Sequence, residues 1–583
     1  MHTPVAILTS RLQSATEMVL GEDHRGADPV LRRSTSPAFG DFQANAAMAL
    51  AKKVGRQPRE LAQAIVDALD VDDVCSSVEV AGPGFINLTM RDEALARAAQ
   101  SLVADERLGV ATAGTTQTFV IDYSHPNVAK EMHVGHLRST IIGDALVRVL
   151  EFLGHRVVRH NHIGDWGTPF GMLIEHLIDL GEEATAQELS VGDLDAFYKS
   201  ARVKFDTDAA FADRARRRVV TLQSGDEETL RLWGILVAES TRYFAAVYDR
   251  LGVTLTPDDI VGESFYNPWL DDVAAELERM GLARIDDGAL CAFPGGFTGR
   301  DGDPLPLIIR KSDGGYGYQA TDLAAIRYRV RDVGADQLLY VVDAGQSQHH
   351  LPMVFAVAAE AGWLGAATPR LVPFGLVLGD DGKRFKSRTG ESVKLSDLLD
   401  EAVVRARAAV SERASDADDD ERTQVARSVG IGAIKYADLA NDRIKDYTFD
   451  FDRMLSFDGN TGPYLQYAHA RVRSIFRRVQ GPSEAGPDTP TIVVGEAAEH
   501  ALVLALLAFP EAVESVAETL QPHRLATHLF EVAQLFTAFY EHCPVLRAAD
   551  DTTRASRLAL CDLTARTLAT GLGLLGIDAL DRM

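Results

Sequence analysis

Cysteine is scarce in this sequence, with four among 583 residues. These four, at positions 75, 291, 543 and 561, lie far apart along the chain. Such spacing suggests neither a disulfide framework nor a zinc knuckle. We therefore expect a reducing, cytoplasmic location and no resident metal ion.

Long apolar runs are also missing. No run approaches the roughly 18 residues that a membrane span needs, and the N-terminal stretch lacks a basic start and a small-residue cleavage site. We therefore expect no membrane partner. The hydrophobic content of 46% is that of a globular protein, and 583 residues are too many for one core, so three or four domains are expected.

Positive charge is in deficit, because 59 Lys and Arg face 84 Asp and Glu, which gives a net charge of −25. Phosphate binding depends largely on Lys and Arg, so this balance weakens the case for a nucleic-acid partner. Net charge is a global sum, however, and a local basic face can coexist with it. The balance therefore does not exclude such a partner.

Three regions separate along the chain. Residues 1–109 mix helical periodicity with a short strand pair, which is typical of an α+β domain. Residues 110–400 alternate strands and helices, a pattern that predicts an α/β parallel sheet, with a polar helical insertion at about 170–260. Residues 401–583 have helical periodicity throughout, except for one Gly/Pro/Ser linker at 481–490.

The sequence "SHPNVAKEMHVGHLRST" (124–140) lies where a predicted strand passes into a predicted amphipathic helix that runs from His136 to about Leu153. In a parallel sheet this turn is at the carboxyl edge, where free N–H groups and the helix dipole favour phosphate. His133 and His136 offer hydrogen bonds, Lys130 a full charge, and Gly135 room for a flat base. By itself a histidine pair at this spacing indicates capping or packing, and a metal site would need further ligands at a zinc-type spacing, which are absent.

"HVGH" (133–136) resembles the His-x-Gly-His motif of class I aminoacyl-tRNA synthetases and related nucleotidylyl transferases. The longer run 124–146 is similar to its arginyl-tRNA synthetase form. Three further blocks, "NHIGDWGTPFGML", "YQATDLAAIRYR" and "GPYLQYAHAR", follow in the family's order, and the chain ends in the similar "RM". The resemblance covers most of the chain. It implies a Rossmann-like catalytic domain between an N-terminal domain that touches the tRNA corner and an all-α anticodon-binding bundle.

The activity that the resemblance implies is arginine–tRNA ligation. ATP and L-arginine would give arginyl-adenylate, which is then transferred to tRNA(Arg), with Mg2+ on the phosphates and a monomeric enzyme expected. Two alternatives stay open. One is a class I ligase for another amino acid such as cysteine, which the scattered cysteines oppose. The other is a synthetase-derived RNA-binding protein without catalysis, which the intact histidine motif opposes.

A guanidinium group has five fixed N–H donors and is recognised well by paired carboxylates and carbonyl-type acceptors. Tyr318 and Asp322 are four residues apart and would share one face of a helix. The resemblance implies an arginine site made of Ser124, Asn127, Glu263, Tyr318, Asp322 and Gln346. Buried acids would reject neutral analogues, so a separate editing domain is unnecessary.

The second catalytic motif of class I synthetases, Lys-Met-Ser-Lys-Ser, is degenerate here. The corresponding stretch, "DDGKRFKSRTGE" (380–391), has Ser387 where the motif has its second lysine. The resemblance implies that Lys130 compensates for it. The resulting ATP-binding candidates are His133, Gly135, His136, Lys383 and Lys386. The catalytic candidates are Lys130, His133, His136, Lys386 and Arg388.

Aromatic residues interleaved with arginines follow position 462. This pattern suits unstacked RNA bases, although the spacing of Tyr464 and Tyr467 is also that of a buried helix face. By resemblance, Tyr464, Tyr467, Tyr540 and Met583 shape the anticodon surface. In the N-terminal region, Gln43 and Asn45 are the candidates for hydrogen bonds to a D-loop base.

Overall fold

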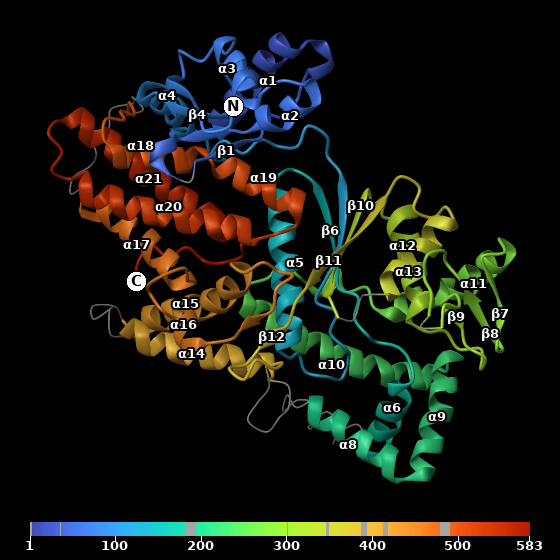
Figure 1. Ribbon diagram of the computed structural model, residues 1–583. Coiled ribbons are helices and arrows are strands. Elements are labelled where there is room, and N and C mark those ends of the chain that lie inside the picture. The colour runs from blue at the N-terminus through green and yellow to red at the C-terminus, as the bar shows by residue number, and fades with distance from the viewer. Residues whose placement is uncertain are drawn as a thin grey trace.

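The computed structural model describes residues 3–34, 36–181, 194–299, 301–345, 349–385, 393–411, 418–478 and 490–583. An N-terminal domain lies at the top of Figure 1, a helical C-terminal region at the left, and a parallel sheet at the centre. The helices α6, α8, α9 and α10 project below the sheet. The expected α/β class with a flanking α+β domain and an all-α region is confirmed.

The N-terminal domain is an antiparallel sheet of order β1-β2-β4-β3 covered by helices. Its elements are α1 (Pro4–Leu20), η1 (Glu22–His24), β1 (Leu31–Arg33), η2 (Pro37–Phe39), β2 (Phe42–Ala44), α2 (Ala46–Val54), α3 (Pro58–Asp67), β3 (Cys75–Ala81), β4 (Phe85–Met90) and α4 (Asp92–Val103). The predicted strand pair is β3 and β4, joined by a turn in which Gly82 and Gly84 have positive φ angles.

The central sheet has the order β11-β10-β5-β6, and every pair in it is parallel. Its elements are β5 (Thr118–Asp122), α5 (Val134–Phe152), β6 (Arg156–His160), β10 (Gln337–Asp343), α13 (His350–Glu360) and β11 (Thr368–Phe374). The chain runs from β5 to β6 on one side and later returns to β10 on the other. The strand order therefore reverses between β5 and β10, the place where ligands bind in such sheets.

The long connection between β6 and β10 carries most of the additional structure. It contains α6 (Pro169–Leu180), α8 (Leu194–Thr207), α9 (Ala209–Gln223), α10 (Glu227–Leu251), η3 (Pro257–Asp259), η4 (Glu263–Trp269), α11 (Leu270–Arg279), β7 (Ala283–Asp286), β8 (Ala289–Ala292), β9 (Leu307–Arg310) and α12 (Tyr318–Arg331). The antiparallel sheet β7-β8-β9 was not anticipated from the sequence, because its strands are only four residues long.

The C-terminal region is helical and begins before residue 402. It contains β12 (Val377–Leu378), α14 (Leu395–Ser411), α15 (Asp419–Leu439), β13 (Tyr447–Thr448), α16 (Phe451–Met454), α17 (Gly462–Arg478), α18 (Ala497–Leu507), α19 (Phe509–Thr519), α20 (His523–His542) and α21 (Asp551–Leu574). Strands β12 and β13 pair in parallel and join the end of the central sheet to this region.

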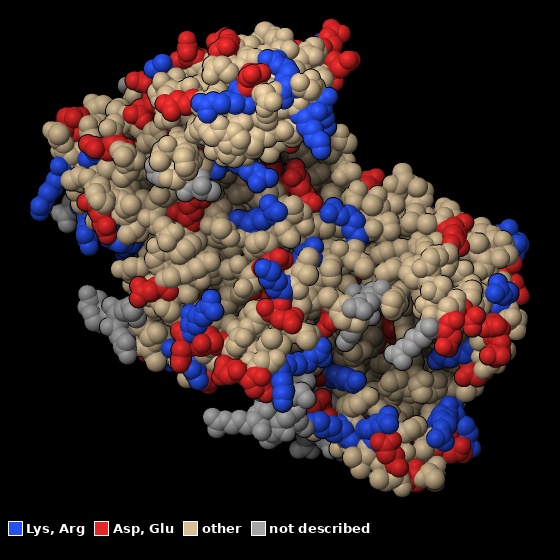
Figure 2. Space-filling view, viewed as in Figure 1, with Lys and Arg blue, Asp and Glu red and all other residues tan. Residues whose placement is uncertain are grey.

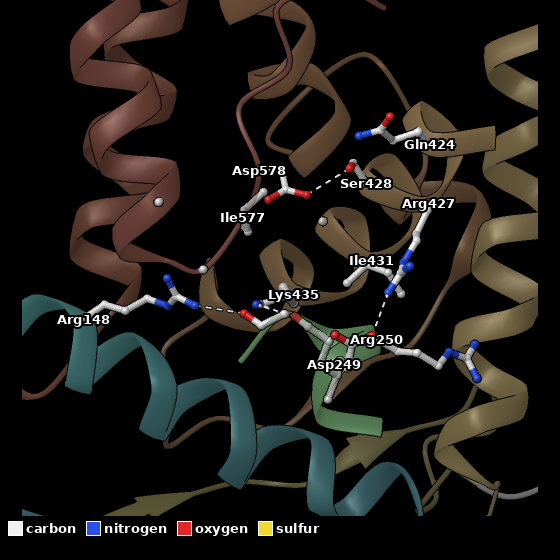
Figure 3. Close-up of a pocket in the computed structure, with 15 residues that line it drawn as sticks. Arg148, Asp249, Arg250, Gln424, Arg427, Ser428, Ile431, Lys435, Ile577 and Asp578 are labelled. Atoms are coloured by element: carbon white, nitrogen blue, oxygen red, sulfur yellow. Dashed lines mark hydrogen bonds and ion pairs between the residues drawn. The ribbon is translucent and has the colours of Figure 1, made fainter. Parts of the chain in front are cut away.

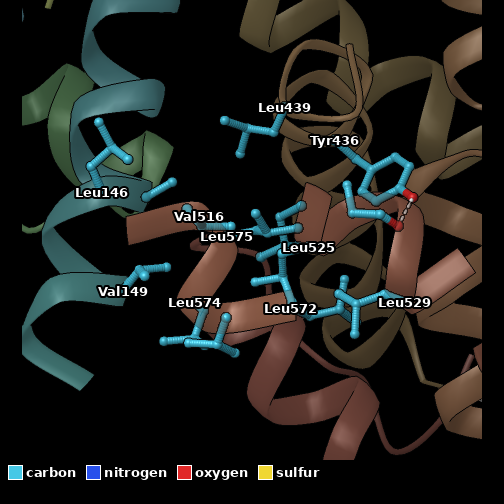
Figure 4. Close-up of a cluster of buried hydrophobic side chains, with 14 of the residues drawn as sticks. Leu146, Val149, Tyr436, Leu439, Val516, Leu525, Leu529, Leu572, Leu574 and Leu575 are labelled. Carbon is cyan, nitrogen blue, oxygen red and sulfur yellow. Dashed lines mark hydrogen bonds between the residues drawn. The ribbon is translucent and has the colours of Figure 1, made fainter. Parts of the chain in front are cut away.

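The helix α5 is buried on every side from Leu137 to Val147, so the prediction of an amphipathic helix was wrong. One face packs on the sheet, and Figure 4 shows Leu146 and Val149 directed toward the C-terminal helices. A helix between two layers has no solvent face to display. Its buried Arg138 is paired with Asp438 of α15 (Nε to Oδ1, 3.2 Å).

A second joint lies beside α5, around a cavity of about 320 Å3 (Figure 3). There Lys435 is 1% exposed, and its Nζ donates to the carbonyl of Leu251 (2.8 Å), while Arg148 donates to that of Gly252 (2.9 Å). Burial lowers the pKa of Lys435 to about 8. Gly576 has φ +67°, and a Cβ there would lie 2.7 Å from Lys435 Nζ. The cavity marks a close junction of α5, α10, α15 and the C-terminal segment.

The N-terminal domain also contacts the helical region directly. His500 of α18 bonds through Nδ1 to Asp92 (2.6 Å) and through Nε2 to Asp41 (3.0 Å). Arg33 of β1 pairs with Glu531 of α20 (2.7 Å). The N-terminal domain is therefore attached at more than one point to the bundle.

One segment departs from the expectation that no stretch could span a membrane. Ala497–Thr519 is long and apolar enough by length and composition, and 56% of its most apolar window is buried. This segment corresponds to α18 and α19, which pack within the helical region (Figure 1). A buried bundle helix passes the same test, so the segment is weak support for a membrane span.

Removing Asp438 tests the joint between α5 and α15. Asp438→Ala leaves the guanidinium of Arg138 buried without its carboxylate, which costs about 3–5 kcal/mol. We expect a lower midpoint of urea unfolding. Asp452→Ala is the matched control, because the side chain of Asp452 is 93% exposed and pairs with Arg405 at the surface. Equal midpoints for the two variants would contradict a structural role for the buried pair.

Candidate active site

A cavity of about 690 Å3 lies at the carboxyl ends of β5, β10 and β11, where the strand order reverses. It brings together many of the residues predicted from the sequence. Those that line it are Ser124, Asn127, His133, Gly135, His136, Glu263, Tyr318 and Asp322. Residues far apart in the chain thus share one cavity, as the motifs predicted.

The turn after β5 is strained. Ser124, His125 and Ala129 have φ angles of 79°, 53° and 59°, in the left-handed region that non-glycine residues rarely adopt. Hydrogen bonds hold it: Ser139 Oγ accepts from Ser124 N–H (2.9 Å), and Ser124 Oγ meets Tyr248 OH (2.7 Å). Strain of this kind persists where surrounding contacts over-determine it, often at functional sites.

The floor of the cavity contains a buried ion pair that the sequence did not reveal. Arg329 of α12, 1% exposed, donates to Asp122 at the end of β5 (2.7 Å) and to His160 Nδ1 at the end of β6 (3.1 Å). Asp122 also bonds His125 (2.7 Å). Burial alone raises the pKa of Asp122, but Arg329 and then His125 hold it well below its ordinary value. The pair ties three elements of the site together.

The two motif histidines cap α5. His133 is the N-cap, its Nδ1 accepts from Gly135 N–H (3.0 Å), and His136 Nδ1 accepts from His133 N–H (3.1 Å). Burial, and then the charge of His133, lowers the pKa of His136 to about 3, so this ring is neutral at pH 7. Since each Nδ1 is an acceptor, each Nε2 carries the proton and is a donor. Two neutral donors therefore stand at the start of the helix.

The acidic end of the cavity contains Glu263 and Asp322. Burial, and then the charges of Asp165 and Asp322, raise the pKa of Glu263 to about 8. Asp322 lies one turn after Tyr318 on α12, as predicted, and bonds His350 Nε2 (2.6 Å). The His350 ring packs edge-on against Tyr318, with centroids 4.6 Å apart. No motif identified His350 as a partner of Asp322, because the two lie 28 positions apart.

The second motif begins as a short hairpin. Phe385 N–H donates to Val377 O (2.9 Å), and Arg384 lines the cavity and reaches Asp343 (3.4 Å). Lys383 is exposed and, in the described part of the chain, is not among the lining residues. The predicted Lys386, Arg388 and Gln346 lie outside the described residues.

Beyond these residues the chain returns to the histidine motif. Val134 N–H donates to Val393 O (3.1 Å), and Lys394 pairs with Glu131 (2.8 Å). The two ends of the second motif are therefore anchored in different places, one on the β12 hairpin and one against the start of α5.

Lys130 is not among the described residues that line the cavity. Its Nζ lies 4.5 Å from the ring centroid of Tyr198 in α8. This contact could not be predicted from the sequence, because Tyr198 follows Lys130 by 68 positions and only the fold brings the two side chains together.

The candidate tRNA residues lie in two parts of the molecule. Gln43 is on β2 and donates to Asn87 (2.9 Å), and Asn45 precedes α2, with no partner for its Oδ1 among the described residues. Both occur in the N-terminal domain.

The others lie in the helical region. Tyr464 packs edge-on against Phe530, whereas Tyr467 is 42% exposed. The guanidinium of Arg471 lies over the ring of Tyr540, 4.9 Å from its centroid. Met583 packs on the cluster formed by α14 and α15. Both interpretations of the tyrosine pair thus apply in part: Tyr464 packs in the bundle, whereas Tyr467 faces outward.

Comparison with known proteins bears on all three regions. The family model described as "tRNA synthetases class I (R), catalytic domain" matches residues 98–451. "Arginyl tRNA synthetase N terminal domain" matches residues 6–90, and "DALR anticodon binding domain" matches residues 465–583. The chain belongs to the arginyl-tRNA synthetase family.

Relatives in this family match over their full length. An "Arginine--tRNA ligase" of Thermobifida fusca is 57% identical over 583 residues, 100% of both chains. One of Frankia casuarinae is 53% identical over 98% of this chain and 97% of its own. Among solved structures, the arginyl-tRNA synthetase of Plasmodium falciparum is 29% identical, with a TM-score of 0.85 and complete coverage of both chains. That of Thermus thermophilus is also 29% identical, with a TM-score of 0.79, over 99% of this chain and 100% of its own.

Gly135 gives a direct test of the histidine pair. A Cβ at this position would lie 2.7 Å from His133 Cε1 and 2.9 Å from its Nδ1, so Gly135→Ala displaces the ring and breaks the cap. We expect at least about a tenfold loss in ATP affinity by calorimetry, the equivalent of one good hydrogen bond. Gly573→Ala, a helical position with nothing within 4 Å of the added carbon, is the control and should bind ATP normally. Unchanged affinity in Gly135→Ala would remove the histidine pair from the nucleotide site.

Proposed function

We propose that this protein is an arginine–tRNA ligase that uses ATP to form arginyl-adenylate and transfers arginine to the 3′ end of tRNA(Arg). One observation supports this most: a single cavity is lined both by paired carboxylates and by the donors of a helix N-terminus. A cationic side chain fits the carboxylates, and a phosphate chain fits the donors. Family membership agrees with the same reaction.

The guanidinium of arginine fits the acidic end. Glu263 and Asp322 supply two carboxylates, and the exposed ring of Tyr318 lies beside them. A neutral side chain would leave these acids without a counter-charge, which disfavours other amino acids. A hydrogen bond to His350 Nε2 (2.6 Å) holds the Asp322 carboxylate in place.

The amino-acid backbone fits the strained turn. Ser124 and Asn127 are proposed to hold the α-amino and carboxylate groups of arginine. Gln346, which lies outside the described residues, is proposed as the third member of this set. The position of Asn127 depends on a glycine opposite, because a Cβ on Gly164 would lie 2.3 Å from Asn127 Oδ1. The side chain of Asn127 therefore leaves no room for a residue larger than glycine at position 164.

The first step is displacement at phosphorus. A carboxylate oxygen of arginine attacks the α-phosphorus of ATP and forms the new O–P bond, while the bond to the bridging oxygen breaks and its electron pair leaves with pyrophosphate. Such a step needs alignment and charge stabilisation more than acid–base work. The neutral Nε2 donors of His133 and His136 and the charge of Arg384 face the cavity for this purpose. Lys130, Lys383, Lys386 and Arg388 remain proposed contributors.

The second step is acyl transfer. A ribose hydroxyl of the terminal adenosine attacks the carbonyl carbon of the adenylate, the ester bond forms, and AMP leaves with the electron pair of the broken C–O bond. The hydroxyl proton passes to solvent. Basic side chains lie in the recess below the N-terminal domain in Figure 2, with acidic ones among them, so this face offers local positive charge despite the net charge of −25. This face, with Gln43, Asn45, Tyr464, Tyr467, Tyr540 and Met583, is the proposed tRNA surface.

Mg2+ is proposed to accompany ATP. In the described portion of the chain no group of three His, Cys, Asp or Glu side chains is placed to hold a metal ion. Mg2+ in nucleotide sites is held largely by substrate phosphates and waters, so this arrangement fits an ion that arrives with ATP. A monomeric enzyme in the cytoplasm is proposed as well; the four described cysteines are free thiols, as a reducing compartment favours.

Arginine-dependent exchange of pyrophosphate into ATP, with and without tRNA(Arg), tests the ligase function. Exchange with arginine in either condition supports it, and exchange only with tRNA would add a pocket completed by RNA. No exchange with arginine in either condition, from folded protein, would reject the function.

Asp322→Ala tests the pocket. We expect the KM for arginine to rise at least about a hundredfold, because a charge-assisted hydrogen-bond pair is lost and a guanidinium is left without its partner. The affinity for tRNA should stay nearly unchanged in a filter-binding assay. Asp313→Ala, an exposed acidic residue outside the cavity, is the control. If neither KM nor tRNA affinity changes in Asp322→Ala, the pocket assignment is wrong.

Arginine binding should depend on pH through Glu263. The pKa of its carboxyl is about 8, so most molecules are protonated at pH 7 and must release that proton when the guanidinium binds. We expect the affinity to rise with pH and to weaken by nearly tenfold for each pH unit below about 8. Calorimetry in buffers of different ionisation enthalpy measures both the affinity and the proton release. Glu263→Gln should bind weakly without this dependence, whereas the exposed Glu278→Gln should retain it. A flat profile in the unaltered protein would exclude Glu263 from guanidinium binding.

A further inference from the structure

The backbone around Lys130 is held tightly on both sides. Ala129, in the left-handed conformation, donates its N–H to Ser240 Oγ (2.9 Å), and Met132 donates its N–H to Tyr243 OH (3.2 Å). Both acceptors belong to α10. The main chain therefore has little freedom, and the position of the ammonium depends on the conformation of the Lys130 side chain.

That side chain rests on α8. The ammonium lies 4.5 Å from the ring centroid of Tyr198, within the range at which the electron-rich face of an aromatic ring attracts a cation. Lys130 is not among the described residues that line the cavity of about 690 Å3, although it precedes His133 by only three positions. The ammonium that the resemblance relates to the degenerate second motif is thus held outside the described lining of the cavity.

The first turn of α8 also faces the histidine motif. Burial lowers the pKa of His133, the charges of Arg384 and Lys130 lower it further, and the carboxylate of Asp195 in α8 opposes them. Asp195 is itself paired with Lys199 (3.3 Å). The helix therefore brings both an aromatic face and a carboxylate close to the start of α5.

We propose that Tyr198 is a positioning residue that holds the Lys130 ammonium on α8, so that the charge reaches the departing pyrophosphate only when Lys130 leaves the ring. This inference rests on the proposed ligase function and on the role of Lys130 in it. A cation on the ring and a cation on the phosphates are mutually exclusive states of one side chain. Weakening the first state raises the population of the second.

Substitutions at Tyr198 separate the aromatic face from simple bulk. Tyr198→Leu removes the face, and Tyr198→Phe retains it. In pyrophosphate exchange with arginine and tRNA(Arg), we expect Tyr198→Leu to raise kcat/KM for ATP about two- to fivefold, the worth of an exposed cation–π contact. Tyr198→Phe should match the unaltered protein. An unchanged or lower value in Tyr198→Leu would overturn the proposal.

A second substitution tests whether the effect passes through Lys130. In a Lys130→Met background, Tyr198→Leu should change nothing further, because the ring has no cation to hold. The same gain with or without Lys130 would show that Tyr198 acts in another way and would overturn the proposal. If the unaltered protein shows no arginine-dependent exchange, the ligase function fails and this inference fails with it. A loss confined to the Tyr198 variants leaves the ligase function intact.

A spectroscopic measurement needs no turnover. With 13C-labelled lysine, the ε-methylene of Lys130 should show an upfield ring-current shift, assigned by its loss in Lys130→Met. The shift should disappear in Tyr198→Leu, persist in Tyr198→Phe, and diminish when ATP and arginine are added to the unaltered protein. A shift that stays unchanged in the ATP and arginine complex would overturn the release of Lys130.

Discussion

The ion pair between Asp122 and Arg329 is the interaction on which the site depends. Asp122 ends the strand that leads into the histidine motif, and Arg329 belongs to the helix that carries Tyr318 and Asp322. Both side chains are almost fully buried. A buried pair of this kind contributes little net stability, but separating its members is costly, so it fixes geometry. Here it fixes the end of β5, which leads into the histidine motif, against the helix that carries Tyr318 and Asp322.

The fold could be predicted where local pattern decides the structure. The strands β5 and β10 are short apolar runs, in a region whose alternation of strands and helices predicts a parallel sheet. The burial of α5 on every side could not be predicted, because its second partner is a helical region about 300 positions later in the chain. Helical periodicity can indicate that one face of a helix is buried, but it does not reveal a second partner that covers the opposite face, as happens for α5.

The residues of the candidate site also fall into those that could be predicted from the sequence and those that could not. Residues within motifs, such as His133, His136 and Asp322, could be predicted as candidates because each stands in a short segment whose residue types and spacing are recognisable together. Their partners could not: Arg329, His350 and Tyr198 reach the site from elements far along the chain and carry no pattern of their own. The position of Lys130 is the clearest case, since the residue was identified and its present contact was not.

The direct attachment of the N-terminal domain to the helical region, through His500 and Arg33, has a consequence for RNA selection. The proposed corner-binding and anticodon-binding surfaces lie on bodies that touch each other, and the helical region is also fastened to α5. The distance between the two surfaces is therefore built into the protein. If both surfaces bind one RNA, as proposed, that RNA has to span a fixed distance, so its overall shape contributes to selection alongside the contacts to its bases.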